Sequence, residues 1–264
     1  MTEQAHVGAP ILEAENLSIQ FGGLKALQEL SFSIPEKTVF SIIGPNGAGK
    51  TTFFNIVTGI YRPTSGDVRL YGESIVRLEP SRIVERGVCR TFQNIRLFQN
   101  LTVLENVMIG RQLHERTGLG DILLQTRHFR AQEAETLDRA AEILDDVGIL
   151  DDANALAKNL PYGKQRRLEI ARALATAPRL LLLDEPTAGM NPSESEEMVQ
   201  LFQRICEERG VCVLMIEHDM KVVMGVSQQI LVLNFGRQIA LGSPREVLEN
   251  EEVITAYLGH QKVM

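Results

Sequence analysis

The amino-acid sequence predicts an α/β fold with a mostly parallel sheet, an N-terminal antiparallel β piece and an α-helical insertion. From residue 39 onward, short apolar runs of strand length alternate with amphipathic runs of helix length, which is typical of a parallel sheet covered by helices. Residues 11–34 instead alternate apolar and polar side chains around Gly22 and Gly23, which predicts two half-buried strands joined by a turn. Residues 94–175 read as the helical insertion.

Local patterns define the remaining elements. The apolar run 39–43 is an expected strand that ends in Gly44, and a helical pattern follows it. Residues 138–147 predict an amphipathic helix. Its apolar face consists of Ala140, Ala141, Leu144 and Val147. The other expected elements are strands at 67–71, 180–183, 211–216 and 230–234, and helices at 50–60, 165–176 and 194–209.

Composition limits the function. With 264 residues, the chain fits one domain, residues 1–264, that contains a helical subdomain at approximately 94–175. The net charge of −7 argues against nucleic acid as the main partner, because phosphate backbones need a basic face. Three cysteines without CxxC spacing fit a reducing compartment. No signal-peptide pattern and no apolar run of membrane-span length is present, so we expect a cytoplasmic chain that reaches a membrane only through a partner.

The strongest motif is a phosphate-binding loop between the expected strand 39–43 and the helix that follows. It reads GPNGAGKT, an instance of GxxxxGK[ST] in the strand–loop–helix context that supports it. Backbone N–H groups can converge on phosphate oxygens only where no Cβ obstructs them. Lys50 would reach the β- and γ-phosphates, and Thr51 would ligate Mg²⁺. The expected nucleotide-binding residues of this loop are Gly44, Pro45, Asn46, Gly47, Ala48, Gly49, Lys50, Thr51 and Thr52.

Two carboxylates follow the apolar strand 180–183. Next to a phosphate loop, Asp184 would hold Mg²⁺ directly or through water, and Glu185 would polarise the attacking water as a general base. Alone, an acidic strand end that caps the next helix explains this pair equally well. The phosphate loop in the same chain favours the catalytic interpretation.

Further segments in this order resemble the ATP-binding-cassette (ABC) ATPases. LPYGKQRR, running into LEIARALA, is similar to their signature segment, and it precedes the Asp-Glu strand as in that family. Gln93 in TFQN, the turn AGMNP and His218 after VCVLMIE also match. The resemblance covers nearly the whole chain. It implies a P-loop NTPase (RecA-like) core, bound ATP and Mg²⁺, and ATP hydrolysis coupled to transmembrane transport.

The resemblance assigns roles to individual residues. Phe21 would stack on adenine, with a core strand aromatic as the alternative. Gln93 would sense Mg²⁺ and the γ-phosphate, and its loop would link the nucleotide to a transmembrane partner. His218 would hydrogen-bond the γ-phosphate and hold water and Glu185 in register.

The signature segment would act in trans, because two cassettes of this family pack head-to-tail. It consists of Leu160, Pro161, Tyr162, Gly163, Lys164 and Gln165. Three positions depart from the family pattern: Pro161 replaces a serine, Tyr162 a glycine and Lys164 a glutamine. Proline offers neither a hydroxyl nor a backbone N–H to a phosphate, while Lys164 adds charge. Our hypothesis is therefore that the chain pairs with a different cassette that carries a fuller signature, so that the site using Lys50, Asp184 and Glu185 is the stronger hydrolytic site.

The details resemble the G-type ATPase of high-affinity branched-chain amino acid importers, through FGGLKAL, RTFQNIRLFQNLTVLENV, IEHDMKVVMGVS and VITAYLG. The implied partners are a second ATPase, two transmembrane permease subunits and, indirectly, a substrate-binding protein. The chain would be peripheral, on the cytoplasmic face of the plasma membrane. Residues 94–107 would contact the permease, or would be internal core of the insertion. A cassette for urea or amides, or for lipid or lipopolysaccharide export, is the alternative function.

Overall fold

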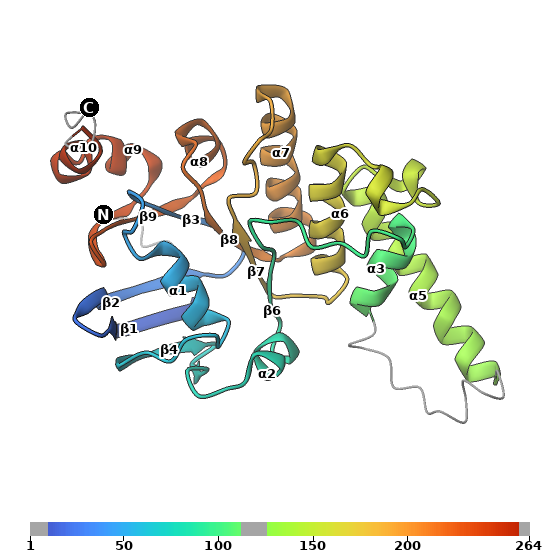
Figure 1. Cartoon of the computed structure of the whole chain (residues 1–264), viewed down its shortest axis with the longest axis horizontal. Coiled ribbons are helices and arrows are strands. Elements are labelled where there is room, and N and C mark those ends of the chain that lie inside the picture. Colours follow the sequence, from blue (N-terminus) through green and yellow to red (C-terminus); the bar gives the residue numbers. More distant parts are fainter. Residues whose placement is uncertain (1–9, 112–125, 259–264) are drawn as a thin grey trace, which may run out of the picture.

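A computed structural model describes residues 10–111 and 126–258, and it has the predicted α/β architecture (Figure 1). Its central sheet has the strand order β10-β9-β3-β8-β7-β6. All of its neighbouring strands pair in parallel except β10, which is antiparallel to β9. The strands are β3 (Val39–Ile43), β6 (Val88–Arg90), β7 (Leu180–Asp184), β8 (Cys212–Ile216), β9 (Gln229–Asn234) and β10 (Arg237–Gly242).

The three central strands β3, β7 and β8 are buried at every position. A parallel sheet is covered on both faces, so its strands are continuous apolar runs rather than alternating ones. Because the three strands run parallel, their carboxyl ends meet at one edge of the sheet. The phosphate loop follows β3, and Asp184 is the last residue of β7. Glu217 directly follows β8.

The N-terminal strands form a separate antiparallel sheet of order β2-β1-β4-β5. Its long hairpin shows the predicted alternation of buried and exposed residues. Helix α1 (Lys50–Val57) joins the core that this sheet shares with the central one, and Phe53 packs 5.2 Å from the ring of Phe32. The strands are β1 (Pro10–Phe21), β2 (Leu24–Pro35), β4 (Ser65–Leu70) and β5 (Glu73–Ser74).

Helices α3 (Val103–Arg111), α5 (Arg127–Asp146) and α6 (Tyr162–Leu174) pack together at the end of the molecule far from the antiparallel sheet (Figure 1). Residues 112–125 of the expected insertion lie outside the described residues, and its limits stay a prediction. In α5 the buried face includes Ile143 in addition to the predicted Ala140 and Leu144, and the predicted Val147 is the buried C-cap residue, whereas Ala141 is only half-buried. Two short 3₁₀ helices, Leu150–Asp152 and Ala157–Asn159, connect α5 to α6.

The other helices are α2 (Pro80–Glu85), α7 (Pro192–Arg209), α8 (Met220–Val226), α9 (Pro244–Leu248) and α10 (Glu251–Leu258). Both α7 and α9 begin with a capping box, in which the side chains at the N-cap and three residues later bond each other's backbone N–H. Within residues 10–111 and 126–258, no helix combines the length and the apolarity that crossing a membrane requires.

Candidate functional site

The loop after β3 has a backbone that only glycine tolerates at two of its positions. Gly44 has φ +148°, and a Cβ there would lie 2.1 Å from the carbonyl oxygen of Leu233. Gly49 has φ +106°, and its Cβ would lie 2.6 Å from the carbonyl oxygen of Ala26. Helix α1 begins immediately after Gly49, whose N-cap position provides no side-chain hydrogen bond. The first N–H groups of α1 therefore remain available to an anion.

Lys50 is folded back over its own loop. Its Nζ donates hydrogen bonds to the carbonyl oxygens of Gly44 (2.5 Å) and Pro45 (3.0 Å). Burial lowers the pKa of Lys50, and the negative charges of Glu185 and Asp184 oppose that shift. The two carboxylates thus lie near enough to the ammonium group to act on it electrostatically.

A cavity of about 650 Å³ opens over this loop. The side chain of Phe21 forms part of its wall and is 45% exposed, so this ring is not a core aromatic. The ring packs edge-on against Tyr61, with the centroids 5.1 Å apart. Glu185 and Phe235 also line the cavity. Of the predicted loop residues, the lining includes Asn46, Gly47, Ala48, Gly49, Lys50, Thr51 and Thr52, while Gly44 and Pro45 contribute the carbonyl groups that Lys50 contacts.

Asp184 ends β7 and is nearly buried. Its Oδ2 lies 2.7 Å from Nη2 of Arg90, and Nη1 of the same guanidinium donates to Oδ1 of Asn55 on α1. The Arg90 guanidinium also lies 5.3 Å from the ring centroids of Phe54 and of Phe92. Arg90 thus fixes Asp184 against α1, a role that the sequence pattern did not reveal.

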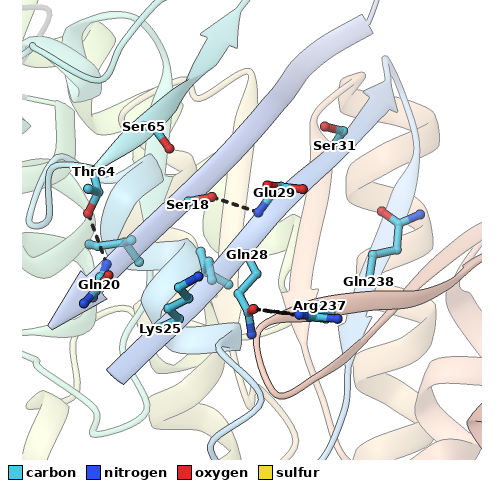
Figure 2. A pocket seen from close by; sticks show the side chains of 12 residues that line it. Ser18, Gln20, Lys25, Gln28, Glu29, Ser31, Thr64, Ser65, Arg237 and Gln238 are labelled. Carbon is cyan, nitrogen blue, oxygen red and sulfur yellow. Dashed lines mark hydrogen bonds between the residues drawn. The ribbon is translucent and has the colours of Figure 1, made fainter. Parts of the chain in front are cut away.

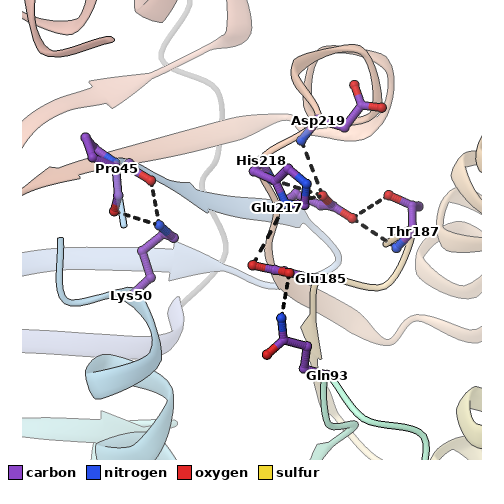
Figure 3. A network of polar contacts seen from close by, with 9 residues as sticks. Pro45, Lys50, Gln93, Glu185, Thr187, Glu217, His218 and Asp219 are labelled. Carbon is purple, nitrogen blue, oxygen red and sulfur yellow. Dashed lines mark hydrogen bonds and ion pairs between the residues drawn. The ribbon is translucent and has the colours of Figure 1, made fainter. Parts of the chain in front are cut away.

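The structure brings the side chains of Glu185, Gln93 and His218 together. Figure 3 shows Glu185 between the other two side chains. Nε2 of Gln93 donates to Oε2 of Glu185 at 2.9 Å, and Nδ1 of His218 lies 3.9 Å from Oε1. Glu185 has φ +48°, a left-handed conformation that is uncommon for a residue other than glycine. Such conformations cluster at functional sites, where the surroundings hold them in place.

Glu217, the residue that precedes His218, was not identified from the sequence. Its side chain is buried and accepts hydrogen bonds from the backbone and hydroxyl of Thr187 and from the backbone of His218 (Figure 3). The signal that could have revealed it is an acidic residue at the end of an entirely apolar strand.

The signature segment lies at the start of α6, and none of its residues is among those described as lining the cavity over the phosphate loop. Pro161 is the N-cap of α6, and Tyr162 is 45% exposed. The positive charge of Lys164 forms an ion pair within this chain, because its Nζ lies 2.6 Å from Oδ2 of Asp152. Leu160 is buried, its carbonyl oxygen accepts from the Gln165 side chain, and Gly163 lies in the first turn of α6.

A second buried cluster ties α6 to the loop of Gln93. The side chain of Arg166 is fully buried and pairs with Glu169 at 2.7 Å. It also donates to the carbonyl oxygens of Phe92 and Gln93, each at 2.8 Å, and to the hydroxyl of Tyr162 at 3.2 Å. Burial raises the pKa of Glu169, and the positive charge of Arg166 opposes that shift.

The antiparallel sheet carries a larger hollow of about 720 Å³, shown in Figure 2. Several of its polar side chains form hydrogen bonds within the fold. Ser18 Oγ accepts from the backbone N–H of Glu29, Thr64 Oγ1 accepts from that of Gln20, and the Gln28 side chain binds Arg237. The bonds of Ser18 and Thr64 satisfy backbone N–H groups in the region where the β1–β2 register shifts. These three side chains therefore stabilise the sheet.

The donors at the site fit Mg²⁺. This cation prefers oxygen ligands and is usually held by one or two carboxylates together with substrate phosphates. The Thr51 hydroxyl lines the cavity, and Asp184 is fixed near Lys50 by Arg90. Among the described residues, no group of three or more His, Cys, Asp or Glu could hold a metal by itself. Any Mg²⁺ site here is thus one that a phosphate completes.

Comparisons with known proteins agree with this geometry. The family model described as ABC transporter matches residues 27–188, and that described as branched-chain amino acid ATP-binding cassette transporter matches residues 237–263. The chain is 48% identical to the high-affinity branched-chain amino acid transport ATP-binding protein BraF of Pseudomonas aeruginosa, over 95% of the chain and 98% of that protein. It is 46% identical to the corresponding protein LivG of Escherichia coli K12, with the same coverage.

Solved structures share the fold as well. The ADP conformation of MJ1267, an ATP-binding cassette of an ABC transporter, superposes with a TM-score of 0.83 at 31% identity and covers 96% of the chain and 100% of that protein. The resemblance drawn from the sequence is thereby confirmed. With a phosphate loop, two carboxylates, a glutamine and a histidine around one cavity, this chain belongs to the ABC transporter family, as one of its nucleotide-binding, ATP-hydrolysing subunits.

Proposed function

We propose that this chain hydrolyses ATP to drive the import of branched-chain amino acids. The main support is its 48% identity to BraF over nearly its whole length. The match of residues 237–263 to the C-terminal model of such transporters adds an independent segment outside the ATP motifs. Uptake of urea or amides, or export of lipid, would leave the ATP site unchanged and is an outcome that the test below distinguishes.

ATP would bind in the cavity over the phosphate loop. Lys50 Nζ would leave the carbonyl oxygens of Gly44 and Pro45 for the β- and γ-phosphates, exchanging two neutral acceptors for charged ones. Free N–H groups at the start of α1 would hold the same phosphates. The exposed ring of Phe21 is available to stack on the base.

Hydrolysis requires a base beside the γ-phosphate, and Glu185 faces the same cavity as Lys50. Its carboxylate would accept a proton from the attacking water, a role worth about 10²–10⁴-fold in rate. Gln93 and His218 lie on opposite oxygens of this carboxylate and would orient it and the γ-phosphate. Mg²⁺, held by Thr51, Asp184 and Gln93, would neutralise charge on the phosphates.

The signature segment would act on the nucleotide of a second cassette. It lies at the start of α6, where the free N–H groups of a helix favour an anion, and not in this chain's own cavity. Pro161 lacks an N–H and Lys164 is paired with Asp152, so this segment offers a neighbour fewer contacts than the usual one. We therefore infer a heterodimer whose stronger site combines this chain's phosphate loop with the companion's signature.

Two permease subunits would be the membrane partners. A groove of about 660 Å³ lies beside the Gln93 loop and includes Phe98, which is 49% exposed. Arg172 lies 5.5 Å from the Phe98 ring centroid, and Leu97 is half-buried against the helical core. The exposed Phe98 and the half-buried Leu97 support a docking groove at the start of residues 94–107, whereas Val103 and Val107 belong to the internal core of the insertion. Contact there would hold the chain at the cytoplasmic face of the membrane.

The test uses the transporter reconstituted in vesicles with its companion ATPase, permeases and binding protein. Glu185→Gln should retain ATP binding and stop hydrolysis and leucine uptake, whereas Lys50→Ala should lose ATP binding. Glu208→Gln, at an exposed position near the end of α7, is a matched carboxylate control. Normal turnover by Glu185→Gln would refute the general-base role. Intact ATP hydrolysis with uptake of urea or amides but not leucine would refute the substrate.

A further inference from the structure

Glu217 is a buried carboxylate with an unusual set of partners. It follows β8, and 1% of its surface is exposed. Its Oε1 accepts from the backbone N–H of Thr187 at 3.0 Å and from the Thr187 hydroxyl at 2.5 Å. Its Oε2 accepts from the backbone N–H groups of His218 at 3.0 Å and Asp219 at 3.4 Å. Every bonded group is a donor, which compensates the burial of a carboxylate.

These partners belong to two neighbouring strand ends. Thr187 lies two residues after Glu185, in the turn that follows β7, and His218 follows β8. The backbone N–H of Glu185 donates to the carbonyl oxygen of Ile216 at 2.9 Å. Glu217 adds two side-chain hydrogen bonds between these two turns, and Figure 3 shows its carboxylate between them. One side chain thus joins the segments that carry the base and the histidine.

The left-handed backbone at Glu185 needs such support. With φ +48°, this residue has a conformation that relaxes unless its surroundings fix it. The bonds of Glu217 to Thr187 fix the turn on one side. On the other side, Nδ1 of His218 lies 3.8 Å from Oε2 of Glu217 and 3.9 Å from Oε1 of Glu185. The imidazole is therefore held between the two carboxylates.

From this geometry we infer that Glu217 is a positioning residue for ATP hydrolysis, which fixes Glu185 and His218 relative to each other without touching the nucleotide. The inference rests on the proposed general-base role of Glu185. It explains why a carboxylate lies inside an apolar core, where an uncompensated charge would be costly.

A glutamine cannot take over this role. Both oxygens of Glu217 accept backbone N–H groups, one set from Thr187 and the other from His218 and Asp219. Whichever way a glutamine amide is turned, its NH₂ group faces a donor. Glu217→Gln therefore keeps the volume and loses one of the two links.

The experiment measures ATP hydrolysis and ATP affinity of the reconstituted transporter. Glu217→Gln should lower kcat by about 10- to 100-fold, part of the range for acid–base catalysis, with KM and ATP affinity within about twofold. In the His218→Ala background the same change should cost no further rate, because the two residues act as a unit. Thr187→Val removes one donor only and should show a smaller loss in kcat. Thr187→Ser, which keeps the hydroxyl, should restore it.

Ser227→Ala is the matched control. It removes a buried hydrogen bond to Ser41 next to α8, away from Glu185 and His218, and should leave kcat unchanged. Unchanged kcat in Glu217→Gln, an equal loss in Ser227→Ala, or additive losses with His218→Ala would overturn the inference. Failure of the general-base assignment is recognised separately, since Glu185→Gln would then still hydrolyse ATP.

Discussion

Arg166, on the helix that starts with the signature turn, donates a hydrogen bond of 2.8 Å to the backbone carbonyl oxygen of Gln93. It makes an equal bond to Phe92 and pairs with Glu169, and its side chain is fully buried. The signature turn and the Gln93 loop of one chain are therefore linked by a rigid side chain. A shift of α6 would move the loop that contacts Glu185.

Arg166→Met should destabilise the folded chain by about 3–5 kcal/mol, because it leaves Glu169 as an unpaired buried carboxylate. Arg139→Met is the control: its pair with Glu142 is exposed on both sides and should cost at most about 1 kcal/mol. Urea denaturation followed by circular dichroism measures both. Equal losses in the two variants would contradict the role of burial.

The Arg166→Met deficit should also depend on pH. Burial raises the pKa of Glu169, so the folded chain binds this proton more tightly than the unfolded chain does. Its contribution is therefore present below the unfolded pKa and is lost as pH rises through the folded pKa. Removing Arg166 takes away the opposing charge and raises that pKa further. The deficit should be smaller at about pH 5 than at about pH 8, since protonation removes the unpaired charge.

Phe21→Ala should weaken ATP binding by about 1–3 kcal/mol, the usual loss for an aromatic side chain that stacks on a base. The effect should appear in KM and leave kcat nearly unchanged, because stacking on the base would hold substrate and transition state equally. Phe235→Ala provides a control in the same cavity wall, at a side chain that is 71% exposed. Equal affinities for ATP in Phe21→Ala and the unmodified chain would rule out stacking.

The two ATP sites of the proposed heterodimer should differ in their rates of hydrolysis. Because Pro161 and the paired Lys164 weaken the signature that this chain offers, Glu185→Gln should abolish most turnover, and the equivalent change in the companion cassette should reduce it less. Single-site variants of the purified transporter, assayed for phosphate release, test this. Turnover that survives Glu185→Gln but stops with the companion's variant would reverse the assignment.

Phe98→Asp should detach the chain from its permeases without changing its fold. The ring is half-exposed in the groove, so a charge there costs little in the free chain and opposes an apolar contact. Copurification with the permeases in detergent measures the loss. Phe235→Asp, at an exposed ring outside the groove, should copurify normally. Normal copurification of Phe98→Asp would exclude this groove as the docking surface.

The cysteines should not react in the folded chain. Burial raises the pKa of Cys212 to about 12 and of Cys206 to about 11, and it also raises the pKa of Cys89. At about pH 8 the thiolate of Cys212 is then only about 10⁻⁴ of the total, and the thiolate is the reactive form. A colorimetric thiol reagent should label none of them within minutes and all of them in guanidinium. Rapid labelling without denaturant would contradict this.

Much of the fold was predictable because its strands carry strong patterns. The run 180–183 and the alternation at 11–34 define buried and half-buried strands directly. The three-residue strand β6 was not predicted, since its pairing with β7 comes from tertiary contacts and not from a local pattern. At the site, the roles of Arg90 and Glu217 were not predicted. Each residue acts on a partner that only the folded chain brings near, Asp184 for Arg90 and Thr187 for Glu217.

The hydrogen bonds from Lys50 to the carbonyl oxygens of Gly44 and Pro45 affect the rate at which the ATPase can cycle. When a spent nucleotide departs, the ammonium group has two acceptors to return to, so no cation is stranded without partners inside a half-buried loop. Product release then carries no such electrostatic penalty. We therefore expect ADP to leave and ATP to enter without a rearrangement of this loop.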